Sequence, residues 1–277
     1  MSTLKFSKMH GLGNDFMMID GIHQDVNLTS QQIADWADRH FGIGFDQLLL
    51  VEKAQSPRAL FKYRIFNADG GEVAQCGNGA RCFARFVREK GLTTENIIAV
   101  ETQTGLLQLK MIDDEMVEVN MGVPDFTPAH IPLLSAQRQT HYHIMLGGQN
   151  ISFCALSIGN PHAVIVVDNV DTAEVHKIGP ALESHPLFPQ RVNVGFMQIV
   201  DRRQFRLRVY ERGSGETQAC GSGACAAMAA GNMLGLLDQL ATAHLLGGDL
   251  QLSWQGEGKP VMMTGSTAHV YEGEIKL

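Results

Sequence analysis

Alternating apolar and polar residues predict that most of the chain forms short strands. Leu4 to Met9 alternates in this way, Gly11-Leu12-Gly13-Asn14 breaks the pattern, and Phe16 to Ile19 continues as a second strand. The further predicted strands cover residues 47–51, 59–66, 97–102, 106–112, 116–121, 142–146, 151–158, 163–167, 193–200, 205–210, 250–254, 260–265 and 268–275. The last of these is a candidate to pair with the first.

Four segments are predicted to be helical. Thr29 or Ser30 can cap a helix that runs to about His40. A second helix opens at Gly77 and ends near Lys90, where Gly91 is a plausible stop, with Arg81, Arg85 and Arg88 on its solvent side. Thr172 to Ile178 is predicted as a short helix. The fourth, Gly221 to Leu234, is apolar or small on nearly every face, so it must be covered all round.

A repeat relates the two halves of the chain. Asn67 to Ala84 (NADGGEVAQCGNGARCFA) and Glu211 to Met228 (ERGSGETQACGSGACAAM) align at a constant offset of 144 residues, as in 220 − 76. The identical pairs are Arg64/Arg208, Gly71/Gly215, Glu72/Glu216, Cys76/Cys220, Gly77/Gly221, Gly79/Gly223 and Ala80/Ala224. Two matched glycine-rich turns indicate a duplicated fold with one thiol from each half.

The same duplication extends to polar positions outside the thiol turns. Gly159-Asn160 superposes on Gly13-Asn14, and Asn193 on Gln47, both at an offset of 146 residues. We expect two lobes, one of residues 1–121 plus 266–277 and one of residues 122–265. The boundary falls at Gly122 to Pro132, where three prolines interrupt any regular pattern.

Composition narrows the class of protein. The 277 residues are 44% hydrophobic and carry a formal net charge of −7, as in an ordinary soluble protein. Because the chain has no basic run and no basic and aromatic stripe, we expect no nucleic-acid partner. No apolar segment of signal-peptide length opens the chain, and none reaches the roughly 20 residues of a membrane span. We therefore expect a cytoplasmic protein.

Five cysteines, an odd number in such a chain, argue against a disulfide framework. Their spacing does not match the closely spaced pairs of a structural zinc site, so no metal is expected. Cys82, Cys154 and Cys225 fit small buried hydrophobic residues.

Cys76 and Cys220 differ because each begins a predicted helix. There the unpaired N–H groups and the helix dipole favour thiolate over thiol. The same N–H groups can hold a carboxylate, and glycines 77, 79, 221 and 223 permit close approach of a ligand.

Two opposed acid/base groups and a bound carboxylate suit inversion of an amino acid at its α-carbon. One thiolate removes the proton, and one thiol delivers another on the opposite face. Without a nucleotide fingerprint or an obvious pyridoxal-binding lysine, a reaction without a cofactor is the simpler hypothesis.

The chain resembles the diaminopimelate epimerase family nearly from end to end. The resemblance rests on KMHGLGNDF (8–16), FGIGFDQLL (41–49), FNADGGEVAQCGNGARC (66–82), GNPHAV (159–164), RVNVGFMQ (191–198) and YERGSGETQACGSGACA (210–226). It implies conversion of LL-diaminopimelate to the meso form without pyridoxal phosphate, on the route to lysine and peptidoglycan precursors. The implied fold is α/β, with two pseudo-symmetric domains, each a mixed, mostly antiparallel sheet curled into a barrel around a central helix. A homodimer is also implied.

The resemblance further implies roles for individual residues. Cys220 takes the proton from the LL substrate and Cys76 returns one, supported by His162 and Glu211. The reacting carboxylate is held by Gly77, Asn78, Gly221 and Ser222. The rest of the ligand, chiefly its far end, is contacted by Asn14, Gln47, Asn67, Asn160, Asn193, Glu211 and Arg212.

Alternatives to these roles remain open on the residues alone. Asn14 and Asn160 fit turn residues, and His162 fits a structural histidine. Asn67 and Asn193 fit residues that cap strands or bind only backbone. Glu211-Arg212 fits a solvated ion pair.

Two other functions keep both thiols. One is a related racemase acting on proline, hydroxyproline or another amino acid, which needs no Glu211-Arg212 recognition. The other is a thiol-disulfide switch or ligand-binding module in which Cys76 and Cys220 cycle between redox states.

Overall fold

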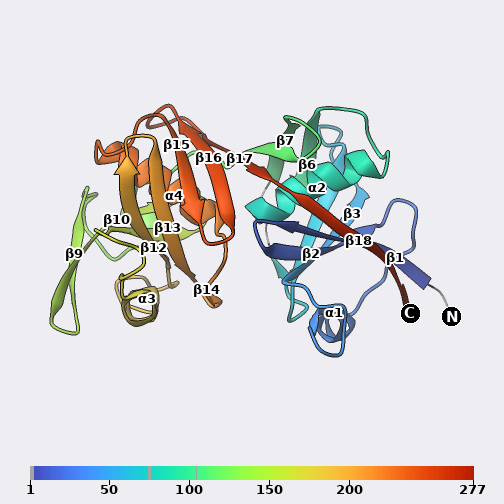
Figure 1. The fold of residues 1–277 in the computed structure, drawn as a ribbon, viewed down its shortest axis with the longest axis horizontal. Coiled ribbons are helices and arrows are strands. Elements are labelled where there is room, and N and C mark those ends of the chain that lie inside the picture. Colours follow the sequence, from blue (N-terminus) through green and yellow to red (C-terminus); the bar gives the residue numbers. More distant parts are fainter. Residues whose placement is uncertain (1–2, 74–75, 104) are drawn as a thin grey trace. The chain divides into compact units, whose positions relative to one another are not determined.

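The computed structural model describes residues 3–73, 76–103 and 105–277. Ala74 and Gln75, part of the predicted turn before Cys76, lie outside the described residues. The chain divides into a first unit, Met1–Val119 with Gly265–Leu277, and a second unit, Asn120–Thr264 (Figure 1). Each unit is mostly sheet with few helices, as the sequence predicts for an α/β fold.

The first unit is a mixed sheet with two helices. Its strand order is β8-β7-β6-β4-β3-β2-β1-β18, with the short β5 beside β4, and only β2–β3 and β4–β6 are parallel among the pairs described. The strands are β1 Thr3–Gly11, β2 Asn14–Asp20, β3 Gln47–Lys53, β4 Phe61–Asn67, β5 Glu72–Val73, β6 Ile97–Thr102, β7 Gly105–Met111, β8 Met116–Asn120 and β18 Ala268–Lys276. The helices are α1 Ser30–Ala37 and α2 Gly77–Glu89. The predicted pairing of the last strand with the first is confirmed.

The second unit repeats this plan. Its order is β9-β10-β11-β12-β13-β15-β16, with β14 beside β13, and β11–β12 and β13–β15 are the parallel pairs described. Its strands are β9 Tyr142–Leu146, β10 Gln149–Ser157, β11 Pro161–Val166, β12 Asn193–Asp201, β13 Gln204–Glu211, β14 Gly215–Glu216, β15 Leu240–Leu245 and β16 Gly248–Trp254. The helices are η1 Pro128–His130, α3 Val175–Glu183 and α4 Gly221–Met233, and β17 Val261–Ser266 leads back into the first unit.

In each unit the sheet bends around one helix. Helix α2 contacts β1, β2, β3 and β7, and α4 contacts β10 to β13, β15 and β16, so strands far apart in the sheet order meet the same helix. The prediction that Gly221 to Leu234 is covered all round is confirmed, because Ala224 to Ala230 are 0% exposed. The sheets curl around these helices as predicted, and among the strand pairs described none closes a sheet into a barrel.

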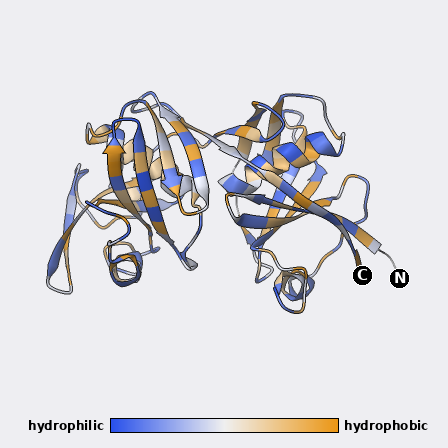
Figure 2. Cartoon of the chain, in the orientation of Figure 1, coloured by the Kyte–Doolittle hydropathy of each residue, from blue (hydrophilic) through white to orange (hydrophobic). Residues whose placement is uncertain are grey.

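The central strands are buried on both faces because a second helix covers the outer side. Residues of β3 therefore alternate between α2 and α1: Leu49 lies close to α2, while Leu48 and Leu50 join the cluster that contains Ile33 of α1. Such strands form continuous apolar runs. Strands with one face exposed, such as β13, instead alternate, as the blue and orange bands in Figure 2 illustrate.

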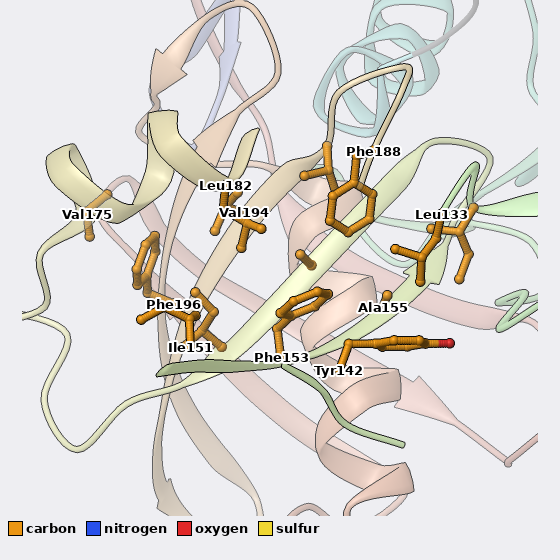
Figure 3. Close-up of a cluster of buried hydrophobic side chains, with 14 residues drawn as sticks. Leu133, Tyr142, Ile151, Phe153, Ala155, Val175, Leu182, Phe188, Val194 and Phe196 are labelled. Atoms are coloured by element: carbon orange, nitrogen blue, oxygen red, sulfur yellow. The ribbon is translucent and has the colours of Figure 1, made fainter. Parts of the chain in front are cut away.

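The matching cluster of the second unit packs α3 onto β12. Figure 3 shows Val175 and Leu182 of α3 near Val194 and Phe196 of β12, all at most 1% exposed. Each such side chain contributes about 1.5–3 kcal/mol by leaving water.

The predicted helix Thr172 to Ile178 is wrong in its bounds, because α3 runs Val175–Glu183 and contains Pro180. A Gly-Pro pair such as Gly179-Pro180 is typical of a helix end. Gly179 is nevertheless buried against the Tyr210 ring, and a Cβ added at Gly179 would lie 2.7 Å from that ring. Packing on β13 thus carries the helix past its local stop signal.

Two further corrections concern α2 and β15. Arg81, predicted on the solvent side of α2, is 0% exposed, and its Nε donates to the Ser266 carbonyl oxygen at 3.4 Å. Arg85 likewise donates to the carbonyl oxygen of Thr267 at 2.6 Å. Both arginines tie α2 to the returning C-terminal segment. Strand β15 was not predicted, since two alanines weaken its strand pattern.

Candidate active site

Each unit places a cysteine immediately before its central helix. Cys76 is the N-cap of α2, with φ −141° and ψ 124°, and Cys220 is the N-cap of α4, with φ −112° and ψ 105°. Both helices have 13 residues. An N-cap side chain faces N–H groups that have no acceptor inside the helix, so each thiol stands where an anion is stabilised.

Matching ion pairs stabilise the segment that leads into each thiol. Arg64 donates to Glu72 through Nε and Nη2, both at 2.8 Å, and Arg208 donates to Glu216 through the same atoms at 2.6 and 2.9 Å. Bidentate pairs of this kind fix geometry as well as charge. They join β4 to β5 and β13 to β14, so the repeat seen in the sequence is a repeat in structure.

The two glycine-asparagine segments are equivalent turns. Gly13 and Gly159 have φ of 83° and 80°, a conformation that other residues rarely adopt. Asn14 follows the first turn and Asn160 the second. The parallel registers also match, because Phe16 faces Gln47 and His162 faces Asn193.

Cys76 contacts polar side chains from β2 and β4. Its Sγ donates to Oδ1 of Asn14 at 3.6 Å, and Nδ2 of Asn78 donates to the same oxygen at 3.3 Å. The Tyr63 hydroxyl contacts the backbone N and O of Cys76, both at 3.3 Å. Burial, and then the neighbouring Cys76, raise the pKa of Tyr63 well above its ordinary value, so this hydroxyl stays neutral.

Gln47 and Asn67 form a second polar pair in the first unit. Nε2 of Gln47 donates to Oδ1 of Asn67 at 2.9 Å, which turns the Gln47 carbonyl oxygen the other way. That Oε1 atom is buried and has no hydrogen-bond partner among the residues that the structure describes. An orphaned buried acceptor is costly, so it suits a donor group on a ligand.

Cys220 is surrounded by donors and one acid. It is 5% exposed, and its Sγ accepts the N–H of Gly223 at 3.3 Å and lies 3.6 Å from the Ser222 hydroxyl. Burial first, and then the charge of Glu211, raise the pKa of Cys220 well above the ordinary value of a thiol. The expectation that the helix start favours thiolate is therefore wrong for Cys220 in this state, because desolvation outweighs the N–H contacts.

His162 reaches Cys220 through a chain of hydrogen bonds. Its Nε2 lies 3.0 Å from Oδ1 of Asn160, and Nδ2 of Asn160 donates to the Ser222 hydroxyl at 3.3 Å. Ser222 in turn contacts the sulfur of Cys220. Burial, and then the positive charge of Arg212, lower the pKa of His162 to about 3, so the ring is neutral near pH 7.

Three other predicted residues of the second unit are Asn193, Arg212 and Glu211. Asn193, 3% exposed, donates to the Pro161 carbonyl oxygen at 3.0 Å and accepts the N–H of Arg212 at 2.9 Å. It therefore binds backbone, as one interpretation of the sequence allowed. Arg212 Nη1 donates to the carbonyl oxygen of Gln190 at 3.0 Å. Glu211 accepts from the hydroxyl of Thr217.

Gly79 and Gly223 serve packing as well as conformation. A Cβ at Gly79 would lie 2.9 Å from the Tyr63 hydroxyl, and one at Gly223 would lie 3.0 Å from Cγ2 of Val209 and 3.2 Å from the Cys220 sulfur. Both positions face the interior of their own unit. That these two glycines also permit close approach of a ligand stays a prediction.

Several residues that support the site were not predicted. Asp15 directly follows Asn14, and Asp46 directly precedes Gln47. Carboxylates beside a turn are usually solvated, so the sequence carried no clear signal that these two support the site. Glu183 is 2% exposed and accepts from Arg191 at 2.6 Å and from the N–H of Gly213 at 3.0 Å, which supports the segment before Asn193. Among the residues described, no group of three or more His, Cys, Asp or Glu is arranged to hold a metal ion.

Solved structures of similar fold define the class. A hydroxyproline epimerase from Agrobacterium vitis, solved with bound trans-4-hydroxy-L-proline, has a TM-score of 0.72 at 14% identity, covering 99% of this chain and 92% of its own. A probable proline racemase from Agrobacterium radiobacter K84 has a TM-score of 0.71 at 16% identity, covering 99% and 93%. A PhzF-family protein from Bacillus anthracis has a TM-score of 0.68 at 16% identity over 100% of both chains. The chain therefore has the α/β fold shared by these epimerases, racemases and PhzF proteins.

Sequence comparisons identify the family within that class. A family model described as diaminopimelate epimerase matches residues 6–127 and 154–270. Relatives named diaminopimelate epimerase from Ectopseudomonas mendocina and Chromobacterium violaceum are 56% and 57% identical over 274 residues, 99% of each chain. The protein belongs to the diaminopimelate epimerase family, as the sequence motifs predicted.

Proposed function

We propose that this protein interconverts LL- and meso-diaminopimelate by proton transfer at the α-carbon, as a step toward lysine and peptidoglycan precursors. The observation that carries the proposal is the matched pair of N-cap cysteines, Cys76 and Cys220, in a chain 56–57% identical to named diaminopimelate epimerases. One thiol stands at the same position of each repeated unit. We assign Cys76 to a lobe of residues 1–121 plus 266–277, and Cys220 to a lobe of residues 122–265.

In the LL direction, Cys220 is the base and Cys76 the acid. Glu211 raises the pKa of Cys220 and lies beside it, so it can take the Cys220 proton before substrate is deprotonated. His162 is neutral and can support the thiols by hydrogen bonding through Asn160. In the reverse direction the roles of the two cysteines exchange.

The charge that develops on the substrate carboxylate needs separate stabilisation. A positioned acid or base contributes about 10²- to 10⁴-fold, which is too little for so weak a carbon acid. N–H groups of the first turns of α2 and α4 supply the rest. We assign this role to Gly77, Asn78, Gly221 and Ser222.

The far end of the substrate carries an ammonium and a carboxylate, so its recognition needs acceptors and donors. The buried Oε1 of Gln47 suits the ammonium, and the guanidinium of Arg212 suits the carboxylate. The full set of assigned ligand residues is Asn14, Gln47, Asn67, Asn160, Asn193, Glu211 and Arg212. A substrate lacking the distal centre, such as proline, would leave these groups unsatisfied.

We also infer that the reaction needs no pyridoxal phosphate and that the enzyme is a cytoplasmic homodimer, as the family resemblance implies. Within the described ranges, no helix is both long and apolar enough to cross a membrane.

Incubation of the purified protein with LL-diaminopimelate in heavy water tests the proposal. Deuterium should enter the α-carbon as the meso isomer appears, without added cofactor. Cys76→Ala and Cys220→Ala should each abolish both the deuterium incorporation and the formation of the meso isomer. Cys154→Ala, at a cysteine that is 3% exposed and lies outside the site, should abolish neither.

Two results would contradict the proposal. Turnover of proline with no turnover of diaminopimelate would favour a related racemase. Full turnover after alkylation of both Cys76 and Cys220 would favour a redox or binding role for the thiols.

A further inference from the structure

We propose that Asp46 is a positioning residue for the first thiol, because it orients the Asn14 amide so that the carbonyl oxygen, and not the NH2 group, faces Cys76. The geometry lies entirely within the first unit. Its catalytic meaning rests on the proposed function, which it deepens by naming a residue that positions the first thiol.

The orientation of Asn14 follows from what each partner can do. Oδ2 of Asp46 lies 2.9 Å from Nδ2 of Asn14 and accepts the N–H of Asp15 at 3.1 Å. A carboxylate only accepts hydrogen bonds, so the NH2 group of Asn14 must face it. The carbonyl oxygen then faces Asn78 Nδ2 at 3.3 Å and the Cys76 sulfur at 3.6 Å.

Asp46 is itself fixed by a charged cluster. Arg39 Nη2 donates to Oδ1 of Asp46 and to Oδ1 of Asp15, both at 2.7 Å. Lys8 Nζ donates to Oδ2 of Asp15. The N–H of Asp46 donates to Asp15 at 2.9 Å. Although burial opposes it, hydrogen bonds from Arg39 and Lys8 hold the pKa of Asp15 well below its ordinary value. The segments around Asp15 and Asp46 therefore hold each other in place, and together they hold Asn14.

At its contact with Asn14, the Cys76 sulfur is better suited to the thiol form than to the thiolate form. A carbonyl oxygen accepts a hydrogen bond from a thiol but repels a thiolate. Tyr63 and Cys82, which interact with Cys76, both have raised pKa values because they are buried, and both are neutral near pH 7. Cys220 differs, because its sulfur faces the N–H of Gly223. The contacts of the two sulfur atoms are thus unequal, because that of Cys76 donates to a carbonyl oxygen and that of Cys220 accepts an N–H.

The pH profile of Cys76 alkylation by iodoacetamide, followed by mass spectrometry, tests this role. Cys76 is the partly exposed cysteine, and the other four are buried. Asp46→Ala releases the Asn14 amide, so alkylation at pH 7 should rise about fivefold, the factor that one ordinary hydrogen bond represents. In an Asn14→Ala background, Asp46→Ala should add nothing, because its effect passes through Asn14.

Asp38→Ala is the matched control. Asp38 lies in the same α1–β3 connection and accepts the N–H groups of His40 and Phe41, both at 2.7 Å. Its removal should leave the alkylation profile of Cys76 unchanged. If Asp46→Ala does not fold, Asp46→Asn serves instead, since its amide pairs with Asn14 in either orientation and should give a smaller rise.

An Asp46→Ala profile that superimposes on wild type would overturn the inference. So would an equal rise in the Asn14→Ala background, because the effect would then be a direct one of charge. Alkylation does not require turnover, so absence of epimerase activity in the wild-type protein would refute the proposed function and leave this readout intact.

Discussion

Acidification from pH 7 to pH 5 should destabilise the second unit through His162. Burial, and then the charge of Arg212, lower the pKa of this ring to about 3 in the folded protein, against about 6.5 in the unfolded chain. Between these values the unfolded state binds more protons, so stability falls as pH falls. Integrated from pH 7 to pH 5, the loss is about 2 kcal/mol.

The two tryptophans allow this loss to be measured in the second unit alone. Trp254 is 0% exposed in β16, and the other tryptophan, Trp36, lies in α1 of the first unit. In a Trp36→Phe background, fluorescence during urea unfolding reports Trp254. The pH-dependent loss in that background should exceed the loss in Trp36→Phe/His162→Gln by about 2 kcal/mol.

Glutamine retains a donor for Asn160 and cannot titrate, which makes His162→Gln the suitable variant. Equal losses with and without His162 would refute the reasoning, because they would mean that the buried ring accepts a proton as readily as an exposed one. Arg212→Gln removes the second cause of the shift, so it should reduce the difference.

Two other substitutions test the second thiol. Gly223→Ala should lower kcat by about 100-fold, because the added Cβ would meet Val209 and the Cys220 sulfur and would displace the sulfur. The control Gly195→Ala, whose Cβ would have its nearest contact at 3.5 Å, should leave kcat unchanged. Equal kcat values for the two variants would contradict this packing role. Glu211→Gln removes the charge that helps raise the pKa of Cys220, so the midpoint of Cys220 alkylation should move to lower pH, and an unmoved midpoint would assign the whole shift to burial.

Local signals were sufficient for most elements of the fold. Thr29 caps α1, and Gly91, with φ 67°, follows the end of α2, as the sequence predicted. The failures occur where distant packing overrides a local signal. Pro180 remains inside α3 because Tyr210 and the cluster around Leu182 bury that helix. Arg81 is buried because α2 packs on the returning chain, where its Nε donates to the Ser266 carbonyl oxygen.

The candidate site divides in the same way. The 144-residue offset was enough to select Cys76 and Cys220, because a repeated motif is a property of the chain alone. The sequence could not predict the difference between the contacts of the two sulfur atoms, since that difference depends on burial and on residues far apart in sequence. Asn14 and Asp46 are 32 positions apart, and no spacing rule links them.

The division of the first unit between the two ends of the chain has a consequence for synthesis on the ribosome. Strand β1 pairs with β18, which is translated only after the whole of the second unit, whereas the second unit is one continuous segment. The second unit can therefore complete its fold while the first still has an exposed edge at β1, which is open to unwanted strand pairing. Truncation of only the last ten or so residues should trap nascent chains in this half-finished state.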